Sequence, residues 1–202
     1  MESESLPLIG SAPAYDLRRH GGYSEPAIAA HPHPIDDASL ARVEQRLVKA
    51  MRGMGAVIIH DLVIPATGTT VDHLCIAPTG ITAIDVERDP EAGGRTALAE
   101  RVRRESQVVA AALTDALVEP DQVSAAICRA TRPEPLRSAS IGDILVGGPR
   151  AVARAARRGR SNGEIDVQLA LAVARSNLGY EHQRAHRVTK PDGYETFLGA
   201  SA

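Results

Sequence analysis

Three short apolar runs in the first half of the chain most strongly limit the folds open to it. Residues 56–64, 71–77 and 81–87 are rich in β-branched side chains and are separated only by polar or glycine-containing turns. Such runs predict strands, and turns this short favour an antiparallel meander. The core must be built from Val, Ile, Leu and Ala, because aromatic residues make up only 2% of the sequence.

Helices are expected before and after this meander. Apolar residues at three- and four-residue steps predict helices over residues 38–52 and 97–117. Later runs predict strands at 122–130 and 141–146 and helices at 149–158 and 165–177. The order helix, three strands, helix, strand, strand, helices predicts an α/β domain with a mixed β-sheet flanked by helices.

The two ends of the chain differ in composition from its middle. Residues 1–36 are rich in Pro, Ala, Ser, Gly and His without periodicity, and residues 180–202 are polar. We therefore expect a flexible N-terminal tail, one domain over residues 37–179 and a polar C-terminal tail. The chain has no signal-peptide pattern and no apolar run of about 18 residues, so we expect a cytoplasmic protein that does not span a membrane.

Carboxylates gather at one end of the predicted hairpin. Asp72 begins its first strand, while Asp85 and Glu87 end its second strand and share a face, because residues two apart in a strand point the same way. Folding the hairpin about Thr79 places Asp72 opposite that end. Clustered carboxylates repel, and a divalent cation such as Mg²⁺ relieves the repulsion and can activate water. From spacing alone the alternative stays open that Asp72 lies at a strand edge and the other two face solvent.

The hairpin also resembles the motif of a known family. Residues 55–60, 71–80 and 81–87 are similar to the central pattern of the nuclease-related (NERD) family, within the restriction-endonuclease-like PD-(D/E)xK superfamily. The resemblance extends over about residues 38–147, and the Asp-His-Leu stretch that begins at Asp72 is its most specific part. It implies a restriction-endonuclease-like core, DNA as a partner, and Mg²⁺ or Mn²⁺ as the cofactor of an active enzyme.

Roles for individual residues follow from that resemblance. Asp72 and Asp85 would be the metal ligands. Glu44, in the first predicted helix, would assist the metal or the attacking water. Gln107, which matches a glutamine near the start of the following helix in the family pattern, would orient the site, and the alternative is an ordinary exposed glutamine.

The sequence departs from the family at one important position. Where the family has a lysine, this chain has Glu87, which reverses the charge expected beside the attacking water. The chain has only two lysines, Lys49 and Lys190, and neither is an obvious replacement. Some members of the wider superfamily work with an acidic residue in this position, so Glu87 stays a candidate member of the acidic site.

Arginines provide a second set of candidate residues. Four of them lie on one side of the helix predicted at residues 149–158, and another lies in the helix predicted at 97–117. Guanidinium groups can contact phosphates through two-pronged hydrogen bonds, although a solvated helix face is the alternative. The candidates are Arg103, Arg150, Arg154, Arg157 and Arg158. Because the net charge is -2, any nucleic-acid contact must come from such a local patch or from a metal ion.

Three functional hypotheses fit these features. The first is a metal-dependent nuclease that hydrolyses DNA phosphodiesters through Asp72 and Asp85. The second is a catalytically degenerate relative that binds nucleic acid or a protein partner without cleaving it. The third is a small structural or partner-binding protein whose hairpin resembles the family only superficially. Glu87, the low net charge and the lack of aromatic residues favour the second, and the clustered acids favour the first.

Overall fold

The computed structural model describes most of the chain from residue 37 onward. The described stretches are residues 37–64, 67–87, 95–130, 138–159, 164–179, 185–187 and 195–197. The chain divides into two units, residues 1–33 and 34–202. The first unit and the tail predicted over residues 1–36 lie outside the described residues.

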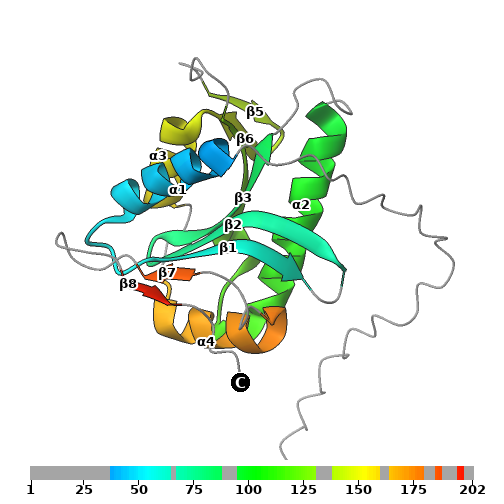
Figure 1. Ribbon diagram of the computed structural model, residues 1–202. Coiled ribbons are helices and arrows are strands. Elements are labelled where there is room, and N and C mark those ends of the chain that lie inside the picture. The colour runs from blue at the N-terminus through cyan, green and yellow to red at the C-terminus, as the bar shows by residue number, and fades with distance from the viewer. Residues whose placement is uncertain are drawn as a thin grey trace, which may run out of the picture. The chain divides into compact units, whose positions relative to one another are not determined.

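A mixed sheet of eight strands forms the centre of the second unit (Figure 1). The strands are β1 (Val57–Ile64), β2 (Thr69–Ala77), β3 (Gly80–Glu87), β4 (Val123–Arg129), β5 (Ala139–Ile141), β6 (Ile144–Gly147), β7 (Ala185–Arg187) and β8 (Glu195–Phe197). They lie in the order β5-β6-β4-β3-β2-β1-β7-β8. β1, β2 and β3 form the predicted antiparallel meander, and β4 pairs with β3 in parallel. The parallel pairing requires a crossover, which is made through a helix.

Four helices cover the two faces of this sheet. They are α1 (Asp37–Met51), α2 (Arg95–Ala112), α3 (Pro149–Arg158) and α4 (Val167–Leu178). Apolar side chains of α1 and α3 pack on one face, and those of α2 and α4 pack on the other. Figure 1 shows α1 and α3 side by side, with α2 across the sheet from them. The chain therefore forms the predicted α/β domain with a mixed sheet flanked by helices.

Strand β3 lies in the middle of this arrangement and is buried along its whole length. Ile81 and Ala83 belong to the core beneath α2 and α4, whereas Ile84 and Val86 belong to the core beneath α1 and α3. Since strand side chains alternate between faces, Asp85 follows Ala83 onto the α2 face. The strand thus presents a carboxylate to a helix inside the protein.

The structure differs from the sequence-based elements in three places. The single strand predicted at residues 141–146 is two strands, β5 and β6, because Gly142 has a φ of 62° and turns the chain between them. The helix predicted to reach residue 117 ends at Ala112 and is followed by a 3-10 turn, after which Leu117 has a φ of 57°. The stretch 180–202, predicted as a polar tail, supplies β7 and β8, and β7 pairs with β1.

The remaining predicted elements agree with the structure to within two residues at each end. Among the described residues, none of the helices combines the length and apolar character needed to cross a bilayer.

Candidate functional site

The β2–β3 hairpin brings Asp72 and Asp85 to the same end of the sheet. Its register runs from Ala77 opposite Gly80 to His73 opposite Ile84, and one further step puts Asp72 opposite Asp85. There the backbone N–H of Val86 donates a hydrogen bond of 2.7 Å to Oδ2 of Asp72, so this N–H is bound by a side chain. Both carboxylates are almost fully buried, with 4% and 1% of their surface exposed. Asp72 therefore contacts the end of β3 that contains Asp85, and the role of the two carboxylates as a shared site stays a prediction.

Helix α2 adds two charged side chains to this place. Arg101 and Glu105 are one helical turn apart and therefore lie on one face of the helix. Nη2 of Arg101 donates a hydrogen bond of 2.5 Å to Oδ2 of Asp85. Nε of Arg101 lies 3.5 Å from Oε1 of Glu105. Arg101 is half-exposed while both acids are buried, so its guanidinium enters the cluster from the surface.

Electrostatic interactions link four residues, here called the acidic cluster: Asp72, Asp85, Arg101 and Glu105. Burial, followed by the negative charge of Asp85, raises the pKa of Glu105 to about 8, although Arg101 acts in the opposite direction. The negative charge of Asp72 raises it further. Near neutral pH, Glu105 is therefore mainly protonated. Burial acts to lower the pKa of Arg101, but Asp85 and the other acids outweigh it and raise that pKa.

Within the described part of the chain, two oxygen atoms of the cluster have no hydrogen-bond partner. They are Oδ1 of Asp85 and Oε2 of Glu105, and both are buried. Unsatisfied buried acceptors are rare because each one costs solvation free energy. A shared proton, a water molecule or a small ligand could bind these two atoms.

Glu87 is compensated by a different arginine. It lies beside Arg129 in the parallel register of β3 and β4. Nε of Arg129 donates a hydrogen bond of 2.6 Å to Oε2 of Glu87, whose side chain is only 4% exposed. Position 87, where the sequence pattern that the hairpin resembles has a lysine, thus holds a glutamate that is paired with a cation from the next strand.

Other predicted site residues lie elsewhere. Gln107 is exposed and lies two residues beyond Glu105, or about 200° around the helix, so its side chain does not face Asp85. Glu44 is half-buried on α1, which packs on the opposite face of the sheet. Among the described residues, the charges that shift the pKa of Glu105 belong to Asp85, Arg101 and Asp72. Glu44 is not one of them.

The residue next to Asp72 in the motif also faces away from the cluster. His73 lies on the α1 face together with Cys75, as the alternation along β2 requires. Its Nδ1 is 2.8 Å from Nδ1 of His60, and the two rings meet edge to face at 84°. One of the two nitrogens must carry the hydrogen and the other must accept it. This buried pair belongs to the packing between β1 and β2.

The arrangement does not fit a divalent-metal site as it stands. Among the residues that the structure describes, no three His, Cys, Asp or Glu side chains are placed to hold one ion. One oxygen of Asp72 is bound to a backbone N–H, and one oxygen of Asp85 is bound to Arg101. Arg101 thereby supplies the positive charge that a metal ion would otherwise bring to Asp85.

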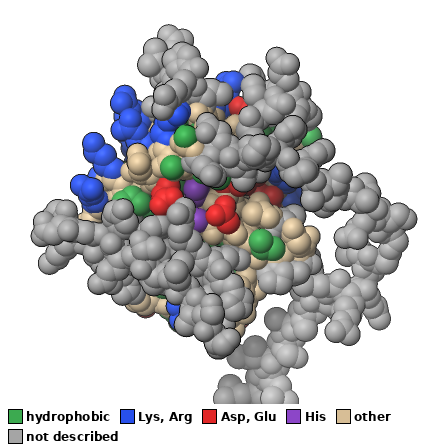
Figure 2. All heavy atoms as spheres, in the orientation of Figure 1, with side chains coloured by type: hydrophobic (Ala, Val, Ile, Leu, Met, Phe, Trp, Pro, Cys, Tyr) green, Lys and Arg blue, Asp and Glu red, His purple; other side chains and the backbone are tan. Residues whose placement is uncertain are grey.

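The candidate phosphate-binding arginines divide into two groups. Arg103 forms an ion pair with Asp143, with Nη2 2.9 Å from Oδ1, and is therefore engaged with the β5–β6 turn. Arg150, Arg154 and Arg157 line a cavity between α1 and α3. Arg158 follows them at the exposed end of α3. Figure 2 shows basic side chains gathered on this side of the molecule, apart from the acidic ones.

The sequence did not point to three residues that surround Asp85 and Glu87. They are Arg101, Glu105 and Arg129. The only local signal for the first two was their i,i+4 spacing, which is common on helices. Arg129 is the only charged residue in β4, and that position was its signal. Its partner could not be identified without the parallel register.

The chain was also compared with known proteins. No family model, no curated protein and no solved structure matches it. Its function is therefore inferred from its own residues and their geometry.

Proposed function

We propose that this protein is a noncatalytic nucleic-acid-binding module with a nuclease-related, restriction-endonuclease-like core. The order of elements supports the core: helix α1, the antiparallel meander β1–β3, helix α2 and the parallel strand β4 follow the arrangement expected from the sequence resemblance. The meeting of Asp72 and Asp85 at the end of the hairpin supports it further.

The ion pair between Arg101 and Asp85 carries the noncatalytic part of the proposal. Its 2.5 Å contact binds one oxygen of the carboxylate that the family resemblance makes a metal ligand. Arg129 binds Glu87 in the same manner at 2.6 Å. Charge-assisted hydrogen bonds of this length are strong, so protein cations compensate both acids. A carboxylate held by an arginine is a poorer ligand for Mg²⁺, which needs free oxygen atoms in nearly ideal geometry.

A second candidate is a metal-dependent nuclease that hydrolyses DNA phosphodiesters. One specific observation favours it: Oδ1 of Asp85 and Oε2 of Glu105 are buried and have no hydrogen-bond partner. These atoms could serve as ligands if Arg101 left Asp85. The noncatalytic function remains the better-supported proposal because it uses the side chains as they are placed.

A cleavage assay separates the two candidates. Linear, circular and single-stranded DNA would be incubated with Mg²⁺ or Mn²⁺ and with wild type, Asp85→Ala or Glu87→Lys. We expect wild type and Asp85→Ala to give the same background, because Asp85 is compensated by Arg101. Cutting that requires the metal and disappears in Asp85→Ala would overturn the noncatalytic proposal. Activity gained by Glu87→Lys alone would identify position 87 as the point where catalysis was lost.

A further inference from the structure

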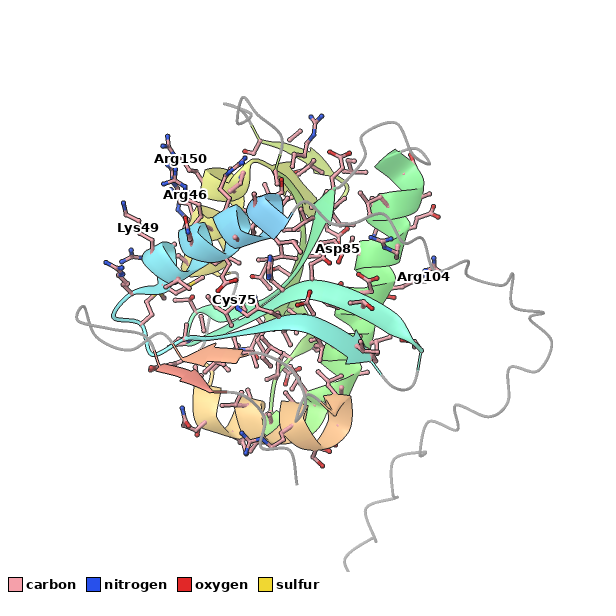
Figure 3. The ribbon with its side chains drawn as sticks, viewed as in Figure 1. Arg46, Lys49, Cys75, Asp85, Arg104 and Arg150 are labelled. Carbon is pink, nitrogen blue, oxygen red and sulfur yellow. The ribbon has the colours of Figure 1, made fainter. Side chains whose placement is uncertain are left out.

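A groove with five basic side chains lies between α1 and α3. It encloses about 250 Å³. The five cations come from both helices and are Arg46, Lys49, Arg150, Arg154 and Arg157. Figure 3 shows Arg46, Lys49 and Arg150 projecting from these two helices, on the side away from α2 and Asp85. We call this site the basic groove.

The charge of the groove is unusual for this chain. The whole sequence has a net charge of -2, yet among the described residues no Asp or Glu lines the groove. Within the described part of the chain, the side chains of Arg46, Lys49, Arg154 and Arg157 form no ion pair. Like charges held this close repel each other, and an anion in the groove would relieve that repulsion.

The basic side chains are mounted on a firmly held helix. Oγ1 of Thr79, in the β2–β3 turn, donates a hydrogen bond of 3.0 Å to the backbone oxygen of Arg157. Gly159 ends α3 with a φ of 63°, and a Cβ at that position would come within 1.6 Å of the backbone oxygen of Thr79. The end of α3 is therefore packed against the hairpin turn, so the backbone that carries the arginines needs little rearrangement when a ligand binds.

We propose that the basic groove binds the phosphate backbone of duplex nucleic acid without reading its bases. From Arg150 to Arg157 the helix rises about 10 Å. Along the axis of a duplex, one strand presents a phosphate about every 3.4 Å. The row thus spans the length of about three phosphates. Arginine predominates over lysine in the groove, and its planar fork suits phosphate oxygens.

The groove lining favours a phosphate backbone over other anionic partners. Among the described residues no aromatic side chain lines it, so these residues give bases no surface on which to stack. The apolar residues of its described lining are Ala50 and Ala153, whereas an amphipathic membrane-binding helix has larger apolar side chains beside its cations. The large exposed apolar residues of the described chain, Val63, Leu117 and Leu169, belong to other elements.

The choice of nucleic acid as the partner rests on the proposed function. Phosphate binding by the basic groove does not require that the acidic cluster be noncatalytic. Groove binding and cleavage can therefore fail independently.

Binding of a fluorescent duplex to the full chain tests the groove. Fluorescence anisotropy would be measured between about 50 and 200 mM KCl, a range over which phosphate contacts weaken strongly. We expect Arg154→Gln/Arg157→Gln to bind about tenfold or more weakly and to reduce the slope of log K against log salt by about 1.8, or 0.9 for each lost phosphate contact. Duplexes of unrelated sequence should bind equally.

Two further variants make the test specific. Arg104→Gln/Arg175→Gln removes the same charge from exposed positions on α2 and α4 and should bind like wild type. Arg46→Gln/Lys49→Gln removes the cations of α1 and should reproduce the loss, which covers the case in which the α3 variant fails to fold. Far-UV circular dichroism would verify the fold of each.

Three results would overturn the proposal. The first is equal affinity and equal salt dependence in wild type and both groove variants, which would mean that the duplex binds elsewhere and would leave the noncatalytic function standing. The second is the absence of duplex binding at the lowest salt, which would remove both proposals. The third is groove-dependent binding of phosphatidylserine vesicles in place of the duplex. Metal-dependent cutting with groove binding intact would instead overturn only the noncatalytic function.

Discussion

Replacing Arg101 by methionine is expected to lower the free energy of unfolding by about 3 kcal/mol near pH 7. The change leaves Asp85, which is 1% exposed, without the cation that binds it at 2.5 Å. Removing one partner of a buried ion pair costs about 3–5 kcal/mol, and we expect the lower end because Arg101 is 50% exposed. Urea denaturation followed by circular dichroism gives this free energy directly.

Two companion variants isolate the ion pair as the cause. Arg104→Met removes an exposed arginine three residues further along the same helix, and should change stability by less than about 0.5 kcal/mol. Arg101→Met/Asp85→Asn removes both charges and should recover much of the loss, because no buried charge is then left unpaired. A loss in Arg101→Met no larger than that in Arg104→Met would show that Asp85 does not depend on Arg101.

The second large effect concerns the pH dependence of stability. The pKa of Glu105 is about 8 in the folded protein, compared with an ordinary value of 4.5. The folded state therefore keeps a proton that the unfolded state releases, and this stabilisation is complete below about pH 4.5 and is lost as the pH rises to about 8. Between about pH 5 and pH 9, wild type should lose about 2–4 kcal/mol relative to Glu105→Gln, which stays neutral.

Urea denaturation at several pH values measures this difference. Glu100→Gln is the matched control, since Glu100 is exposed on the same helix and should follow the pH dependence of wild type. At high pH, Glu105→Gln should be the most stable of the three proteins. Parallel pH curves for wild type and Glu105→Gln would mean that Glu105 is not protonated inside the acidic cluster.

The hairpin could be predicted because its determinants are local. A short turn between two β-branched runs fixes both the pairing and the register, so Asp72 could be placed against the end of β3 from the sequence. The burial of both faces of β3 follows from helices on each side, which the order of elements indicated. In the structure Oδ2 of Asp72 binds the N–H of Val86 at that end.

The compensating arginines could not be predicted because their contacts are not local. Arg101 reaches Asp85 across the helix–sheet interface, and Arg129 reaches Glu87 through the parallel register of β3 and β4. The first contact depends on how α2 crosses the sheet and the second on how β3 pairs with β4, and no spacing in the sequence specifies either. The strands β7 and β8 were missed because three residues give too short a pattern.

A Mn²⁺ titration followed by electron paramagnetic resonance tests most directly whether protein cations have replaced a metal at Asp85. The proteins to compare are wild type, Asp85→Asn, Arg101→Met and Arg101→Met/Asp85→Asn. We predict that wild type binds no Mn²⁺ in a manner that depends on Asp85, and that Arg101→Met gains a site which the double variant lacks. A stoichiometric Mn²⁺ site in wild type that is lost in Asp85→Asn would contradict this account.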